Sequence, residues 1–193
     1  ITVGLGGGSV STNTAVGNSV ISSAATGTYN TGVGQNALNA LTGGGSNTGI
    51  GAYSLAANTN GIYNSGLGVN SLVANTTGSY NTGVGFQALQ ANTTASNNTA
   101  VGYQAGYANT TGAYNVALGS GALRVNTANY NTAVGGNASY ANTTGANNVA
   151  IGTSSQGANT TGSYNVSVGF ESLNANTTAN NNTAVGYQAG YSN

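Results

Sequence analysis

The chain consists of a seventeen-residue repeat that runs through its whole length of 193 residues. Each full copy carries an Asn, then Thr, Ser or Val, a small residue, an aliphatic residue and a Gly. From Val16 onward the aliphatic residue recurs at every seventeenth position, with one interval of sixteen between Leu118 and Val134, and the interval from Val3 to Val16 is thirteen. The aliphatic residues are Val3, Val16, Val33, Ile50, Leu67, Val84, Val101, Leu118, Val134, Ile151, Val168 and Val185. A fixed period of this kind restricts the chain to a stacked, repetitive architecture.

Two columns of the repeat do not vary. The residue after the aliphatic is Gly in every copy, including Gly34, Gly51, Gly68, Gly85, Gly102, Gly119, Gly135, Gly152, Gly169 and Gly186. The residue three positions before the aliphatic is Asn, including Asn30, Asn47, Asn64, Asn81, Asn98, Asn115, Asn131, Asn148, Asn165 and Asn182. Other columns carry Ala or Ser, often a Leu, and the sequence Asn-Thr-Thr-Gly.

The repeat predicts one short strand per copy. Seventeen residues are too few for a helical-repeat unit, and Gly, Asn and Thr are poor helix formers. The alternation of Thr or Val, a small residue, and Val, Ile or Leu is typical of a strand with its bulky and small residues on opposite faces. Gly directly after the strand and the Asn-Thr-Thr-Gly segment favour turns. We therefore expect an all-β solenoid, a β-roll or β-helix, in which residues 1–193 form one domain of twelve stacked coils.

Stacking places identical residues above one another at the strand spacing of about 4.8 Å. Asn above Asn can exchange amide hydrogen bonds, and Thr above Thr packs well, as in other stacked β-arrays. The sequence therefore predicts Asn, Thr and Gly ladders. These ladders explain why NNTAVGYQAGY occurs twice without change, at 97–107 and 181–191. A coil depends on a matching neighbour to cover its surface.

The composition argues against most chemistry. The chain has one basic residue, Arg124, and one acidic residue, Glu171, and contains no His, Cys, Met, Trp, Pro, Asp or Lys. It therefore offers no thiolate or imidazole for a metal, and no paired titratable groups for acid–base catalysis. One Arg against one Glu does not favour nucleic-acid binding. No apolar run is long enough to span a membrane. We expect no enzyme, no cofactor, no bound metal, no nucleic-acid partner and no membrane insertion of this segment.

The apolar content of each copy is small for an isolated coil. Each copy has one aliphatic residue in the strand and sometimes a Leu, namely Leu38, Leu55, Leu72, Leu89, Leu123 or Leu173. Packing several chains together would pool these aliphatic side chains around a shared axis. The chain also begins and ends within the motif, which suggests a piece of a longer fibre or subunits stacked end to end. We therefore expect a homo-oligomer, either a trimer or an end-to-end polymer.

The motifs NNTAVGYQA and YNVALGSGA resemble the head repeats of trimeric autotransporter adhesins, with similar runs in phage tail fibres and related surface fibres. The resemblance covers all the copies and includes the Asn and Gly columns. The copies here are longer than is typical of that family, Thr usually replaces its middle Val, and no neck or coiled-coil stalk is present. The resemblance implies a trimeric β-roll in an extracellular location, on a cell or virion surface.

Several exposed features are candidates for contacts. A Tyr precedes the Asn column in many copies, and a stripe of Tyr63, Tyr80, Tyr114, Tyr130 and Tyr164, together with Tyr29, could stack on a surface glycan or host receptor, or could shield the ladder. A second aromatic set comprises Phe86, Tyr103, Tyr107, Phe170, Tyr187 and Tyr191. The Asn-Thr-Thr segments are formal glycosylation sequons at Asn75, Asn92, Asn109, Asn142, Asn159 and Asn176, although a ladder is the preferred interpretation.

The regular Thr columns also raise ice binding, but such a surface needs two outward Thr per strand and the strand has only one. Arg124 and Glu171 lie in different columns, three copies apart, where we expect surface positions of little consequence. The hypothesis that follows is a structural component of an extracellular fibre, of the adhesin-head or tail-fibre-shaft type, that forms a rigid rod for surface attachment. The alternatives are a self-polymerising extracellular filament and an ice- or glycan-binding solenoid.

Overall fold

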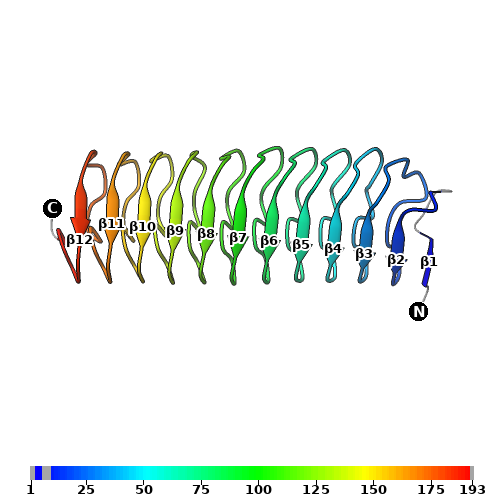
Figure 1. Ribbon diagram of the computed structural model, residues 1–193, viewed down its shortest axis with the longest axis horizontal. Coiled ribbons are helices and arrows are strands. Elements are labelled where there is room, and N and C mark those ends of the chain that lie inside the picture. The colour runs from blue at the N-terminus through cyan, green and yellow to red at the C-terminus, as the bar shows by residue number, and fades with distance from the viewer. Residues whose placement is uncertain (1–2, 6–9, 192–193) are drawn as a thin grey trace.

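The computed structural model describes residues 3–5 and 10–191, which form one elongated array (Figure 1). Within these residues there are twelve strands of three residues, arranged in one sheet in chain order, and no helix. The strands are β1 (Val3–Leu5), β2 (Thr14–Val16), β3 (Thr31–Val33), β4 (Thr48–Ile50), β5 (Ser65–Leu67), β6 (Thr82–Val84), β7 (Thr99–Val101), β8 (Val116–Leu118), β9 (Thr132–Val134), β10 (Val149–Ile151), β11 (Val166–Val168) and β12 (Thr183–Val185).

Strands β2 to β12 are parallel and pair column by column. Thr31 of β3 lies opposite Thr48 of β4, and Val33 lies opposite Ile50, so each turn of the chain stacks directly on the next. The predicted all-β solenoid is therefore confirmed, with about ten turns between β2 and β12. The seventeen-residue period is the length of chain that makes one circuit and returns to the same wall.

The first copy does not form a turn of this array. Strand β1 runs antiparallel to β2, with Val3 opposite Val16 and Leu5 opposite Thr14. The prediction of twelve equivalent coils is thus wrong at the N-terminal end, while Ile1 and Thr2 of that copy lie outside the described residues. The physical reason is the short interval of thirteen between Val3 and Val16, which falls short of the seventeen that a full circuit needs.

Residues with positive φ bend the backbone at fixed places in each turn. In the turn that follows β5, these residues are Gly68 (φ 136°), Asn70 (φ 57°), Leu72 (φ 52°) and Tyr80 (φ 59°). A left-handed conformation costs a non-glycine residue about 1–2 kcal/mol. Hydrogen bonds to both neighbouring turns offset this cost, because the Asn70 N–H donates to the previous turn and the Leu72 N–H donates to Ala88 O of the next, at 2.9 Å.

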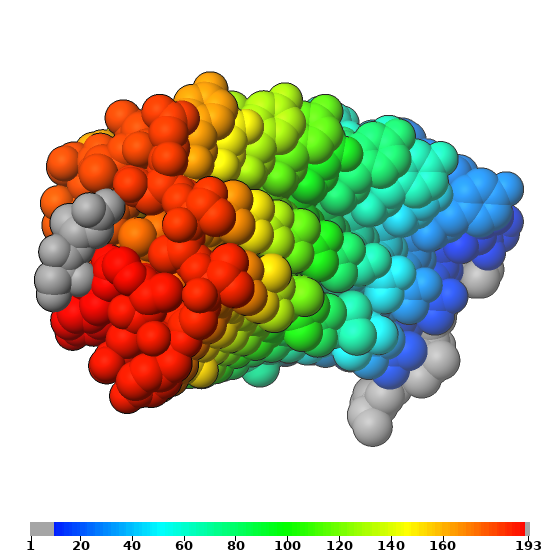
Figure 2. All heavy atoms as spheres, turned by 60° about the vertical axis from the view of Figure 1, so that its left-hand side comes forward, coloured from blue at the N-terminus to red at the C-terminus, as the bar shows by residue number. Residues whose placement is uncertain are grey.

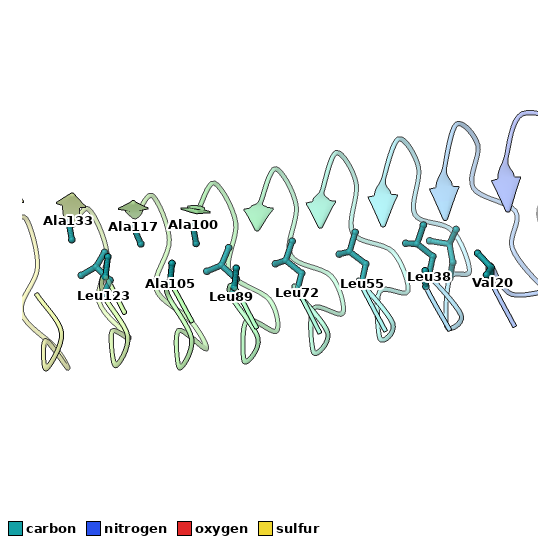
Figure 3. Close-up of a cluster of buried hydrophobic side chains, with 14 of the residues drawn as sticks. Val20, Leu38, Leu55, Leu72, Leu89, Ala100, Ala105, Ala117, Leu123 and Ala133 are labelled. Carbon is teal, nitrogen blue, oxygen red and sulfur yellow. The ribbon is translucent and has the colours of Figure 1, made fainter. Parts of the chain in front are cut away.

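The core is filled from the wall opposite the strands (Figure 3). The members of the leucine column are at most 2% exposed; they are Leu38, Leu55, Leu72, Leu89, Leu123 and Leu173. Those labelled in Figure 3, from Leu38 to Leu123, point toward the strand wall. The aliphatic residues that end the strands point outward instead, and Ile50 is 41% exposed. These aliphatic residues therefore do not fill the core of their own coil.

Space inside the solenoid explains this orientation. A Cβ atom added to the central strand residue Gly49 would lie 3.3 Å from Cγ of Leu38, so the interior at the strand wall accepts only Gly, Ala or Ser. The larger residues on either side of each central position must consequently face outward, because side chains alternate across a strand.

The turn between β8 and β9 is one residue shorter than the others and keeps its register. Val116 still pairs with Thr132, so the missing residue is lost from the corner near Ala128. The carbonyl oxygen of Ala128 accepts hydrogen bonds from the side chains of Asn115 and Asn126, both at 2.8 Å. The array therefore tolerates a change of length at this corner without a shift in its strands.

Candidate functional site

The Asn that precedes each strand forms the first Asn column. In Asn47, Oδ1 accepts a hydrogen bond from the backbone N–H of Asn64 at 2.9 Å, and Nδ2 donates to the carbonyl of Gly61 at 2.8 Å. This column thus joins successive turns by side chain–backbone bonds, and the amide–amide bonds predicted from the sequence also occur in it, as from Nδ2 of Asn47 to Oδ1 of Asn30 at 3.0 Å. Members from Asn30 to Asn165 are buried, and Asn182 in the last described turn is partly exposed.

The Asn of the Asn-Thr-Thr segments forms a second Asn column inside the solenoid. Nδ2 of Asn75 donates to Oδ1 of Asn58 at 3.0 Å and to the carbonyl of Gly78 at 2.9 Å. The six Asn residues in formal sequons, Asn75, Asn92, Asn109, Asn142, Asn159 and Asn176, are all at most 1% exposed. Their amide nitrogens are enclosed in the folded chain, which matches the ladder interpretation rather than glycosylation.

The Gly after each strand stands where successive turns come closest. The φ angles of Gly34, Gly51, Gly68, Gly85, Gly102, Gly119, Gly135, Gly152, Gly169 and Gly186 lie between 123° and 138°. A Cβ atom on Gly51 would lie 2.6 Å from the carbonyl carbon and oxygen of Gly68. Only glycine fits this combination of backbone angle and contact.

The outward side of the strands, which we call the strand face, is uncharged and carries one column of mostly hydroxyl-bearing side chains beside one column of aliphatic side chains. One of its columns carries Thr, Ser or Val, and the other carries the aliphatic residues that end the strands. Its more exposed members are Ile50, Leu67, Val101, Leu118, Ile151, Val166 and Val185. These side chains form rows along the sheet, and Figure 2 shows how side chains of successive turns line up along the long axis.

The Tyr residues that precede the first Asn column are exposed and stack where they are adjacent. Tyr63 and Tyr80 have ring centroids 5.1 Å apart, and Tyr114 and Tyr130 have centroids 5.2 Å apart. Tyr164 is 62% exposed and has no Tyr in the turns beside it. This Tyr column therefore presents ring faces and edges outside the solenoid.

The stacking of Tyr63 on Tyr80 is expected to contribute about 1 kcal/mol of coupling to stability. A double-mutant cycle with Tyr63→Asn and Tyr80→Asn measures it by chemical denaturation, because Asn already occupies this column at Asn97. The matched cycle pairs Tyr29 with Tyr63, which are separated by the turn of Ser46, and there we expect coupling near zero. Equal coupling in both cycles would contradict direct stacking.

A second aromatic set borders a different corner. Phe86 stacks on Tyr103 with centroids 5.8 Å apart, and Phe170 stacks on Tyr187 at 5.6 Å. All four rings occupy the position directly after the glycine column. The three turns between the two pairs carry Ser120, Gly136 and Thr153 at this position.

Arg124 lies between two aromatic rings. Its Cζ atom is 5.1 Å from the ring centroid of Tyr107 and 5.5 Å from that of Tyr140. Its Nε–H donates to Oε1 of Gln104 at 3.0 Å, and Nη1 donates to the hydroxyl of Tyr140 at 3.1 Å. This cluster was not predicted from the sequence, although Tyr107, Arg124 and Tyr140 occupy the same column in three successive turns.

The remaining polar columns serve the array itself. Oγ1 of Thr59 donates to the carbonyl of Thr76 at 3.1 Å, and the same bond recurs from Thr76 to Thr93. Glu171 accepts a hydrogen bond from Nε2 of Gln188 at 2.7 Å. Within residues 3–5 and 10–191 no group of three His, Cys, Asp or Glu residues could hold a metal ion. The same part of the chain contains no helix with the length and apolarity needed to cross a membrane.

The exposed strand face, the two aromatic sets and the Arg124 cluster are thus the candidate contact surfaces of the chain. No family model, curated protein or solved structure matches the sequence or the fold of this chain.

Proposed function

We propose that this chain is a structural segment of an extracellular fibre, in which copies of the chain pack through their strand faces into a rigid rod for surface attachment. The observation that carries the proposal is the aliphatic column of the uncharged strand face, which continues over strands β2 to β12 and includes exposed residues such as Ile50, Leu118 and Ile151. Exposed apolar side chains that line up in this way are typical of an interaction site.

A second copy of the same chain is the occupant that the strand face suits best. Its columns repeat at the strand spacing of about 4.8 Å, and an identical chain presents columns at the same spacing. The face contains neither Arg124 nor Glu171, so copies meet there without burying a charge, which would be costly. The resemblance to trimeric adhesin heads favours three copies around one axis.

The interior supports a rod rather than a flexible tether. Each turn donates and accepts hydrogen bonds on both sides, and the two Asn columns connect the interiors of successive turns. Ten strand spacings from β2 to β12 give a length of about 48 Å. Bending such an array would break backbone and side-chain bonds in several turns at once.

The test is the mass of the protein in solution, measured by light scattering. We expect about three times the chain mass of 18.6 kDa. The double variant Leu118→Lys, Ile151→Lys places charges on the strand face and is expected to give monomers with an unchanged circular dichroism spectrum. Tyr164→Lys, at an exposed position of the Tyr column, is the control for added charge outside the strand face and is expected to keep the wild-type mass.

Other outcomes would contradict the proposal. If the wild-type protein were a monomer in solution, the proposed assembly would be wrong, and a solitary binding solenoid would be the better hypothesis for its function. Open-ended filaments in negative-stain images would favour the self-polymerising alternative. A thermal-hysteresis assay on the same sample tests the ice-binding alternative, for which we expect no activity because the strand face offers only one Thr column.

A further inference from the structure

We propose that the hollow beside Arg124 is a binding site for a carboxylate-bearing saccharide, such as a uronic acid unit of a surface glycan. We name it the Arg124 hollow and define it by Gln104, Ser120, Arg124, Asn137, Tyr140 and Asn174. It lies within one chain, at the corner that follows the strands, and contains none of the aliphatic residues of the strand face.

The hollow lies where small residues interrupt two outer columns of larger side chains. Gly121 and Ser154 in its walls share the column of Gln104, and Gly157 shares the column of Arg124 and Tyr140. The four strand spacings from the turn of Tyr103 to the turn of Asn174 correspond to about 19 Å, which is long enough for several sugar units.

Two cavities lie in this stretch and share Asn137 and Tyr140 in their walls. One, of about 240 Å³, is bordered by Arg124, Tyr103 and Ser120. The other, of about 370 Å³, is bordered by Ser154, Gly157 and Asn174. Together they fall within the range of about 300–1,000 Å³ that is typical of small-molecule sites.

Arg124 supplies the recognition of an anion. A guanidinium group has five N–H donors, and the contacts to Gln104 and Tyr140 use two of them. The other three have no partner among the residues that the structure describes. The two Tyr rings and Gln104 hold the group in place, so the entropy lost when it binds a carboxylate is small.

The charge is not neutralised by a neighbouring acid. Glu171, the sole acidic side chain of the sequence, lies three turns from Arg124, in the turn of Asn174 at the far end of the hollow, where it hydrogen-bonds to Gln188. A single uncompensated cation suits one carboxylate, whereas a nucleic acid or a polyphosphate would require several.

The walls of the hollow offer contacts for the ring and the hydroxyl groups of a sugar. Tyr103 is 55% exposed and offers a ring face for stacking against the apolar side of a pyranose. The side-chain amide of Asn137 is exposed and makes no hydrogen bond within the described residues, so its donor and acceptor are available to hydroxyl groups. Ser120 adds an exposed hydroxyl on the same wall.

The experiment compares two ligands on the wild-type protein and on three variants. The probes are a trisaccharide of galacturonic acid and its methyl ester, which keeps the rings and hydroxyls and loses the charges. Titration calorimetry or ligand-observed NMR is expected to show binding of the acid in the millimolar range or tighter, weakened by added salt, with at least tenfold weaker binding of the ester.

Arg124→Gln is expected to remove the preference for the acid, and Gln90 shows that the same column accepts Gln. Ser120→Tyr is expected to abolish binding by filling the hollow, because Ser120 borders the cavity that contains Arg124. Ser120 is exposed, and Tyr103 occupies the same column in the preceding turn, so the fold is expected to persist. Glu171→Gln is the control that leaves binding unchanged or slightly tighter.

The proposal is overturned if the wild-type protein binds neither probe, if acid and ester bind equally, or if Arg124→Gln binds the acid as well as wild type. Displacement of the trisaccharide by an equal concentration of inorganic sulfate would also overturn it, because the site would then be a simple anion site. The variants that test the Arg124 hollow leave the strand face intact. Light scattering on the same samples therefore separates failure of this site from failure of the proposed assembly.

Discussion

Replacing Gly102 by alanine is expected to lower the free energy of unfolding by about 4 kcal/mol or more, because backbone strain and a steric clash add together. Gly102 has a φ of 138°, a region that is essentially reserved for glycine. A Cβ atom at this position would lie 2.6 Å from the carbonyl carbon and oxygen of Gly119 in the next turn. Relief of this clash requires the two turns to separate, which would weaken the hydrogen bonds that join them. Chemical denaturation followed by circular dichroism measures the loss.

Gly136→Ala is the matched control for this prediction. Gly136 lies outside the left-handed region, and the nearest atom to a Cβ there is Cγ2 of Thr153 at 4.0 Å. The free energy of unfolding should therefore change by no more than about 0.5 kcal/mol. If Gly102→Ala and Gly136→Ala lowered the free energy of unfolding by similar amounts, the close approach of successive turns would not explain the glycine column.

Replacing Asn98 by alanine is expected to cost about 3 kcal/mol of stability. The Oδ1 atom of Asn98 accepts the backbone N–H of Asn115 at 2.9 Å, and its Nδ2 donates to the carbonyl of Gly112 at 2.8 Å. Alanine would leave the buried N–H of Asn115 without a partner, at a cost of about 1–3 kcal/mol, and would open a cavity. Thermal and chemical denaturation of the variant give the magnitude.

Two control variants, Asn98→Leu and Asn97→Tyr, show whether the loss of stability comes from the missing hydrogen bond of Asn98. Leucine fills the space and adds apolar surface but cannot accept the Asn115 N–H, so we expect Asn98→Leu to be destabilised as well. Asn97 is exposed and occupies the Tyr column, so Asn97→Tyr should be close to neutral. Recovery of full stability in Asn98→Leu would contradict the hydrogen-bonding role of the first Asn column.

The period and the column identities were enough to predict the parallel solenoid and the position of each strand from β2 to β12. Every circuit must return to the same wall within one period of the sequence, and the local signals for strand and turn agree with this length. The orientation of the strand could not be obtained in the same way. Both faces of Thr31-Gly32-Val33 are plausible interiors until Ile21 is known to reach Gly32 and Leu38 to reach Gly49.

The Arg124 hollow could not be predicted from the sequence either. Its walls come from different columns of several turns, and their distances depend on how the corner bends. The aligned repeats show that Tyr107, Arg124 and Tyr140 occupy one column in three successive turns. They did not show that the guanidinium group lies between the rings, because the path of the corner is set by positive-φ residues such as Gln104 that have no distinctive sequence signal.

The shortened turn between β8 and β9 has a practical consequence for protein engineering. Since the loss of one residue near Ala128 leaves Val116 opposite Thr132, this corner is a suitable place for grafting a foreign peptide. Copies grafted at the equivalent corner of successive turns would be displayed at intervals of about 4.8 Å, as on a molecular ruler. Grafts on alternate turns would double that interval, so the number of intervening turns sets the density of the displayed epitope.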